Sequence, residues 1–93
     1  MAHNLVEEKI KAGALIVDVR TEDEFMDGAY PKAVNIPVGE LQSRMKELEP
    51  KTKPLVLYCA SGARSALASK MLKASGWTDV VNAGGLDDMP GGS

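Results

Sequence analysis

Hydrophobic residues along the chain recur in two rhythms, one typical of short buried strands and one typical of helices with a single apolar face. The strand-like runs are short and rich in Leu, Ile and Val, and the run from Leu55 to Tyr58 is the most hydrophobic of them. The helical rhythm is clear where Leu41, Met45 and Leu48 share one face. This pattern predicts strands at residues 15–19, 34–36, 55–58 and 79–82.

Polar residues and glycines mark where the helices begin and end. Asn4 with Glu7, and Thr21 with Glu24, have the spacing of a capping box, and glycine commonly follows the last turn of a helix. Helices are therefore predicted from Asn4 to Gly13, from Thr21 to Gly28, and over residues 40–48 and 64–75. Gly84-Gly85 and the segment from Met89 are expected to be loop, with a flexible tail from about residue 90.

Strands that alternate with helices are typical of an α/β protein with a parallel sheet. We therefore expect a small parallel sheet of about four strands, with helices on both of its faces. The chain has 93 residues, of which 44% are hydrophobic and 26% are charged. This length and composition predict one globular domain over residues 1–93.

The charge balance and the apolar runs argue against two classes of partner. Eleven basic residues against thirteen acidic ones give a net charge of -2, which offers no electrostatic attraction for nucleic acid or an anionic membrane. The N-terminal residues hold no apolar run of signal-peptide length, and no stretch approaches the ~18 apolar residues of a membrane span. We expect a cytoplasmic protein, or a periplasmic one if a signal peptide has been removed.

Cys59 is the only cysteine in the chain, so no internal disulfide can form. His3 is the only histidine, which leaves too few ligands for a structural zinc site, and we expect no metal and no cofactor. A lone cysteine is most often a small buried hydrophobe. Cys59, however, follows a strand and precedes a helix, and ligands of parallel α/β folds bind beyond the carboxyl ends of the strands. This position favours a functional interpretation.

The segment after Cys59 has the character of an anion-binding loop. Its residues are small, and Gly62 permits a positive φ angle where the chain must turn. Backbone N–H groups above a helix N-terminus can converge on an anion, and the helix dipole lowers the pKa of a thiol placed there. We therefore expect Cys59 to be a nucleophilic thiolate at neutral pH. The anion-binding residues predicted with it are Ala60, Ser61, Gly62, Ala63, Arg64 and Ser65.

Motifs in the right order and spacing resemble those of the rhodanese family over roughly residues 5–90. They are Leu15 to Arg20 with Glu24-Phe25 and Gly28, then Ala33 to Pro37, the Cys-x-x-Gly-x-Arg-Ser loop within Tyr58 to Ser65, and Gly84-Gly85. The resemblance implies a rhodanese fold and a thiosulfate sulfurtransferase activity. In this family the cysteine takes the outer sulfur of thiosulfate, becomes a persulfide, and gives that sulfur to cyanide or a thiol.

Other functions share parts of this pattern. The cysteine phosphatases, whose loop is similar, place five residues between cysteine and arginine, whereas four separate Cys59 from Arg64. The shorter loop makes a tighter ring of N–H groups, which suits one sulfur better than a phosphoryl group. A sulfur carrier, working with a thioredoxin-like or persulfide-donor protein, needs the same loop and is the first alternative. A non-catalytic interaction module is the second, although such modules often lack the cysteine.

The side chain of Arg64 has two possible roles in this loop. It either binds the anion or points inward to pair with Asp18, and the inward pairing is favoured because a buried Asp18 would need a partner. Arg20 and Glu24, four residues apart, are expected to pair with each other.

The chain also departs from the family pattern. Ala29-Tyr30 stands where a His-Ile pair is common, so any role of that histidine is absent. Met89 stands where a tryptophan often follows the glycine pair, and we expect a looser pocket rim there. Trp77 is predicted to lie in the core.

Overall fold

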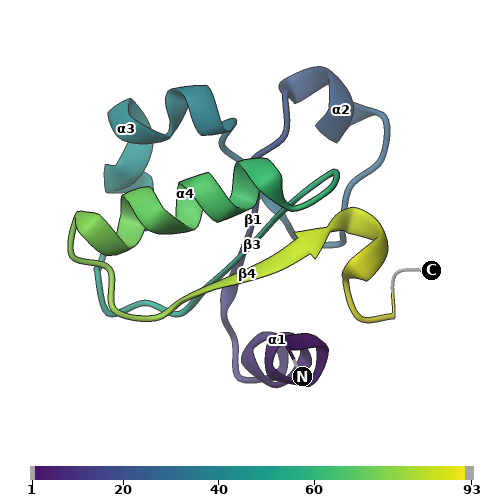
Figure 1. Cartoon of the computed structure of the whole chain (residues 1–93), viewed down its shortest axis with the longest axis horizontal. Helices are drawn as coiled ribbons and strands as arrows, with labels where there is room; N and C mark the ends of the chain where they lie inside the picture. Colours follow the sequence, from purple (N-terminus) through teal and green to yellow (C-terminus); the bar gives the residue numbers. More distant parts are fainter. Residues whose placement is uncertain (1, 92–93) are drawn as a thin grey trace.

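The computed structural model describes the backbone of residues 2–91 and the side chains of residues 5–91. Its centre is a four-stranded, all-parallel sheet with the strand order β2-β1-β3-β4 (Figure 1). The strands are β1 (Leu15–Asp18), β2 (Val34–Asn35), β3 (Leu55–Cys59) and β4 (Val80–Gly85). The helices are α1 (Ala2–Lys11), α2 (Glu22–Met26), α3 (Leu41–Arg44) and α4 (Ala63–Ala74). The predicted α/β class is confirmed.

Two apolar clusters cover the two faces of the sheet because side chains alternate along each strand. In β3, Leu55, Leu57 and Cys59 face one cluster, which takes in residues of α3 and α4. Val56 and Tyr58 face the other cluster, together with Val6 of α1. Figure 1 shows α1 on one side of the sheet and α3 and α4 on the other. A strand that is buried on both sides reads as a continuous hydrophobic run, as β3 does.

The predicted strands all form, and the differences lie mostly in the helices. The first helix begins at Ala2, before the expected cap at Asn4, whose side chain lies outside the described part. Residues 38–48 form α3 between two short 3-10 turns, Val38–Glu40 and Met45–Leu48, instead of one helix. Leu41 and Leu48 are nevertheless fully buried, so the predicted apolar face reaches the core.

The C-terminal part of the chain is more ordered than its sequence suggests. Gly84-Gly85, expected to be loop, are the last two residues of β4 and pair with the end of β3. A 3-10 turn, Leu86–Asp88, follows, and Met89 and Pro90 are buried. The flexible tail was predicted from about residue 90, but Pro90 is buried and its carbonyl oxygen accepts a hydrogen bond from the Tyr30 hydroxyl. Gly92 and Ser93 lie outside the described residues, so the prediction is not tested there.

Two further expectations concern Trp77 and the membrane. Trp77 is buried, as predicted, and its Nε1–H donates a hydrogen bond to the Leu48 carbonyl oxygen at 3.3 Å. None of the helices within residues 2–91 combines the length and the apolar character needed to cross a bilayer.

Candidate functional site

Cys59 is the last residue of β3, at the carboxyl edge of the sheet between β1 and β4. Only three residues separate it from α4, which begins at Ala63, one residue earlier than predicted. Gly62 makes the turn into the helix with φ 103°, a left-handed conformation that favours glycine. The end of the strand therefore places the thiol next to the N-terminus of a twelve-residue helix.

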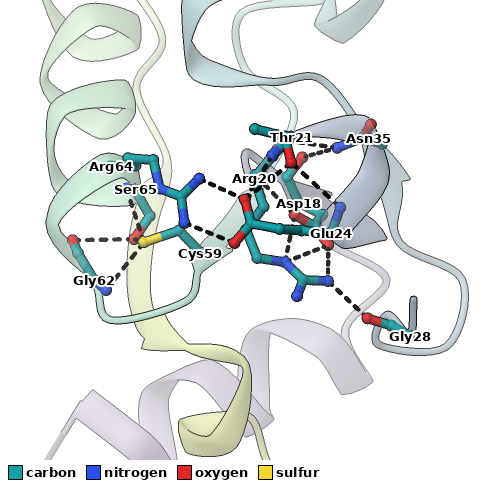
Figure 2. Close-up of polar contacts among 10 residues, drawn as sticks. All are labelled: Asp18, Arg20, Thr21, Glu24, Gly28, Asn35, Cys59, Gly62, Arg64 and Ser65. Carbon is teal, nitrogen blue, oxygen red and sulfur yellow. Dashed lines mark hydrogen bonds and ion pairs between the residues drawn. The ribbon is translucent and has the colours of Figure 1, made fainter. Parts of the chain in front are cut away.

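The Cys59 sulfur is surrounded by hydrogen-bond donors, as Figure 2 shows for Gly62 and Ser65. The Gly62 N–H donates to Sγ at 3.0 Å and the Ser65 N–H at 3.4 Å, and the Ser65 hydroxyl oxygen lies 3.4 Å from it. Burial raises the pKa of the thiol. Hydrogen bonds from the Ser65 side chain and from the N–H groups of Ser65, Gly62 and Ser61 outweigh that effect, so that the pKa lies below the ordinary cysteine value.

Cys59 itself is completely buried and belongs to the apolar cluster on the α4 side of the sheet. The general expectation that a lone cysteine is buried therefore holds for Cys59. It does not account for the contacts of the sulfur, which are polar. By contrast, the loop residues Ala60, Ser61 and Ala63 are exposed. The site thus consists of a covered sulfur under a loop whose outer surface faces solvent.

The glycine pair at the end of β4 allows the loop to approach the strand. A Cβ atom on Gly85 would overlap the carbonyl oxygen of Ala60. A Cβ atom on Gly62 would come within 3.4 Å of the Gly84 Cα. Gly85 therefore excludes a side chain for lack of space, whereas Gly84, with a positive φ of 97°, also excludes one because of its backbone conformation. The glycine pair therefore belongs to the structural support of the cysteine loop.

Asn82 of β4 is a neighbour of the loop that the sequence did not single out. Its Oδ1 accepts hydrogen bonds from the Ser65 hydroxyl at 2.6 Å and from the Gly84 N–H at 3.0 Å. A shift of register between β3 and β4 lies beside it, because Leu57 pairs with Asn82 while Tyr58 pairs with Gly84. An asparagine side chain commonly accepts a hydrogen bond from the backbone N–H two residues on, as Asn82 does from Gly84. Only the fold brings it to Ser65.

The predicted ion pair between Arg64 and Asp18 is wrong. Arg64 instead forms two hydrogen bonds with Glu24 of α2, at 2.7 and 3.0 Å (Figure 2). The contact with the Arg64 guanidinium holds the pKa of Glu24 at about 2. The side chains are 36% and 35% exposed, so the pair lies at the surface beside the loop and does not point into the core.

Asp18 is fully buried, as expected, and its partner is Arg20. Arg20 Nη2 lies 2.7 Å from Asp18 Oδ2, and the Tyr58 hydroxyl donates to the same oxygen at 2.7 Å. The predicted pairing of Arg20 with Glu24 is therefore also wrong. Sequence separation favoured that pairing, but β1 places Asp18 and Arg20 on one side of the strand end, where a short buried pair can form.

These contacts determine what the site can hold. Two N–H groups and one hydroxyl lie at hydrogen-bond distance from one sulfur atom, an arrangement that stabilises a sulfur anion. The cation of the loop, Arg64, is already paired with a carboxylate. Within the described side chains, no three His, Cys, Asp or Glu residues gather as metal ligands would.

A family model for the rhodanese-like domain matches residues 2–89, which is nearly the whole chain. The chain belongs to the rhodanese-like domain family. A sulfurtransferase from Allochromatium vinosum is 41% identical over 68 residues, which cover 73% of this chain and 63% of the relative. The thiosulfate sulfurtransferase PspE from Escherichia coli is 35% identical over 74 residues, which cover 78% of this chain and 71% of the relative. This chain thus spans less than two thirds of the first relative's length.

The solved structures agree with this assignment. A structure described as rhodanese with anions from E. coli superposes with a TM-score of 0.79 at 32% sequence identity, covering 84% of this chain and 93% of that one. The fold is therefore a rhodanese fold. The names of the relatives support sulfur transfer as the general class of activity.

The two departures from the rhodanese pattern have structural explanations. Tyr30 stands in place of the common Ile, and its backbone N–H donates to the Tyr58 hydroxyl at 2.9 Å while its own hydroxyl donates to the Pro90 carbonyl oxygen at 2.6 Å. Met89 is buried in the cluster beneath α1. The expectation that Met89 loosens a pocket rim is therefore wrong, because its side chain fills the core.

Proposed function

We propose that this rhodanese-like domain transfers sulfane sulfur from thiosulfate, or from a similar small anion, to a thiophilic acceptor through a persulfide on Cys59. The observation that carries the proposal is the set of donors around Sγ, with the Gly62 N–H at 3.0 Å and the Ser65 N–H and hydroxyl at 3.4 Å. Donors that stabilise a thiolate can also stabilise the negative charge of a persulfide.

The reaction consists of two displacements at sulfur. In the first, the Cys59 thiolate attacks the outer sulfur of thiosulfate. A new S–S bond forms, the old S–S bond breaks, and its electron pair leaves with sulfite. In the second, cyanide or a thiolate attacks the terminal sulfur of the persulfide, and the electron pair of the breaking bond returns to Cys59. No oxidant, metal or cofactor is required for this balance.

Ala60, Ser61, Gly62, Ala63, Arg64 and Ser65 are the residues that we assign to the anion. Gly62 and Ser65 contact the sulfur directly. Arg64 is available to an incoming anion only if it exchanges its contact with Glu24. Because Cys59 has no exposed surface, the donor reaches the sulfur only after a movement of the surrounding loop.

The loop length favours sulfur transfer over phosphoryl transfer. Four residues separate Cys59 from Arg64, one fewer than in cysteine phosphatases. Within this shorter loop the donors already lie at hydrogen-bond distance from Sγ, so they suit a single additional sulfur atom. A cysteine phosphatase would need space for a tetrahedral group above the thiol.

The partners that we propose are a small sulfur-containing anion as donor and cyanide, a thiol or a thioredoxin-like protein as acceptor. Because Cys59 is the only cysteine, the persulfide has no second thiol in the chain to receive the sulfur. A carrier that is loaded by a persulfide-donor protein satisfies the same geometry. The sulfurtransferase and the carrier differ in the donor, which is a small anion for the first and a protein persulfide for the second.

Intact-mass measurement after thiosulfate treatment tests the proposal. The wild-type protein is expected to gain the mass of one sulfur atom, which a reductant or cyanide removes, whereas Cys59→Ser gains nothing. Steady-state thiocyanate formation from thiosulfate and cyanide should be lost in the same variant.

The outcomes separate the alternatives. Negligible turnover with thiosulfate, together with efficient loading from a protein persulfide, would establish the carrier function. Failure of the wild-type protein to accept sulfur from either source would refute sulfur transfer through Cys59.

A further inference from the structure

The Ser65 hydroxyl has more neighbours than it has protons. Its oxygen lies 2.6 Å from Asn82 Oδ1, 3.2 Å from the Gly62 carbonyl oxygen, 3.3 Å from the Gly84 carbonyl oxygen and 3.4 Å from Cys59 Sγ. Carbonyl oxygens can only accept, and a hydroxyl group has one proton to donate. The hydroxyl therefore donates to one of these groups at a time, and the 2.6 Å contact with Asn82 is the shortest.

The orientation of the Asn82 amide is determined by its other contacts, and Nδ2 donates to the Gly62 carbonyl oxygen at 3.5 Å. The Gly84 N–H points at Oδ1 from 3.0 Å. If the amide were turned over, an NH2 group would face that N–H, and two donors would oppose each other. Oδ1 must therefore face both Gly84 and Ser65, and it accepts from both. Since an oxygen cannot donate, the proton in the 2.6 Å contact belongs to Ser65.

This arrangement has different consequences for the two states of the thiol. While the sulfur is protonated, its S–H can donate to the Ser65 oxygen, and the Ser65 proton remains with Asn82. When the sulfur becomes a thiolate or a persulfide anion, it can only accept. The Ser65 hydroxyl can then donate to it by rotating away from Asn82, and the 2.6 Å hydrogen bond is given up.

We propose that Asn82 is a positioning residue that competes with the Cys59 sulfur for the single proton of the Ser65 hydroxyl. Asn82 holds this proton while the site is at rest, and the anionic sulfur takes it during the reaction. Asn82 acts through Ser65 and does not touch the sulfur. The effect on sulfur transfer rests on the proposed function, whereas the effect on thiol ionisation does not.

Charged groups around the loop set a constant background for this competition. On α4 and α2 these are Arg64 and its partner Glu24. Asp88, in the turn after β4, accepts a hydrogen bond from the Gly85 N–H at 2.8 Å. On the strand itself, the neighbouring Tyr58 faces the opposite cluster. Because asparagine is neutral, its replacement by another neutral residue leaves all these charges in place.

The test is a double-mutant cycle on the Cys59 pKa, read from the pH dependence of iodoacetamide alkylation without any sulfur donor. Asn82→Ala should lower this pKa by about half a unit, a shift that corresponds to part of the free energy of one neutral hydrogen bond. Ser65→Ala should raise it, because the anion loses a donor. In the Ser65→Ala background, Asn82→Ala should have no further effect.

Two further variants separate competition from a loss of structure. Asn82→Ser retains a short side chain that can accept from the Gly84 N–H but does not reach Ser65, so it should lower the pKa as Asn82→Ala does. Asn82→Asp retains the acceptor but adds a negative charge that by itself disfavours the thiolate, so this variant should raise the pKa. A merely structural role would shift the pKa in the neutral variants Asn82→Ala and Asn82→Ser even in the Ser65→Ala background, and thermal unfolding reports whether each variant is folded.

The proposal is overturned if Asn82→Ala leaves the pKa unchanged, or if it lowers the pKa equally with and without Ser65. Persulfide formation is measured separately by mass. If the cycle holds while neither thiosulfate nor a protein persulfide leaves sulfur on Cys59, the competition stands and the proposed function fails. If sulfur is transferred but the cycle fails, the reverse conclusion applies.

Discussion

Tyr58 connects the strand that carries Cys59 to the buried charges behind it, and its replacement by Phe provides a quantitative test. Its hydroxyl donates to Asp18 Oδ2 at 2.7 Å and accepts from the Tyr30 N–H at 2.9 Å. The side chain is completely buried, and burial raises the pKa of Tyr58 to about 12. Tyr58→Phe removes the hydroxyl but leaves the ring packed in the cluster beneath α1.

The magnitude follows from the two lost hydrogen bonds. A hydrogen bond to a charged group is worth about 1.5–3 kcal/mol and a neutral one about 1 kcal/mol. Asp18 keeps its contacts with Arg20, so it is not left without a partner. We expect a loss of about 3 kcal/mol in the free energy of unfolding, which lowers the Tm by roughly 12–24 °C in a domain of this size.

Chemical denaturation of the wild-type protein, Tyr58→Phe and Tyr30→Phe is the assay. Tyr30→Phe is the matched control, because it removes a single hydroxyl that donates to the Pro90 carbonyl oxygen and should cost only about 1 kcal/mol. Below the melting temperature, Cys59 alkylation should be unchanged in both variants, since the donors to Sγ come from the loop. The reasoning is refuted if Tyr58→Phe costs no more than Tyr30→Phe.

Three further predictions concern the loop. Gly85→Ala places a Cβ atom against the Ala60 carbonyl oxygen, so it should destabilise the fold by about 1–3 kcal/mol and slow Cys59 alkylation. Gly39→Ala is the control, because its Cβ atom meets nothing within 4 Å and the variant should be neutral in the same unfolding assay. Glu24→Gln keeps the capping box but releases Arg64, so the KM for thiosulfate should fall about two- to fivefold at low salt; an unchanged KM would contradict this. The pKa of Cys59 is lower in the native state than in the unfolded chain, where it is about 8.5. At a pH between these two pKa values, the thiol is protonated in the unfolded chain and ionised in the native state. The free energy of unfolding should therefore rise with pH across this window in reductant, and Cys59→Ser should abolish the slope.

The accuracy of the sequence predictions depended on how local the deciding interaction was. The capping box of Thr21 and Glu24 was predicted and is present, because all its atoms lie within four residues. The helix expected over residues 40–48 is interrupted, although its buried leucines were identified correctly. Gly84-Gly85 was expected to be loop because glycines weaken strands, but pairing with β3 outweighs that preference.

The ion pairs show the limit most clearly. Charge and burial indicated that Asp18 needs a cation, and that was correct. Two arginines and two carboxylates can be paired in two ways, however, and sequence spacing favoured the wrong one. The direction in which each side chain leaves its strand or helix decides the pairing, and that direction depends on how β1, α2 and α4 are placed relative to one another.

The sequence by itself determined the class of fold, the position of the single thiol and the loop that follows it. Hydrophobic periodicity and turn residues encode these features through neighbouring residues, so they can be read directly. The sequence also pointed to Gly62 and Ser65, whose groups contact the sulfur. Only the tertiary structure decided which distant side chains contact that loop. Asn82 reaches Ser65 across seventeen residues, and Glu24 reaches Arg64 across forty, because a parallel sheet brings the carboxyl ends of distant strands to one edge. The thiol and its direct donors are therefore encoded locally, while the side chains that hold Ser65 and Arg64 are brought there by the assembled sheet.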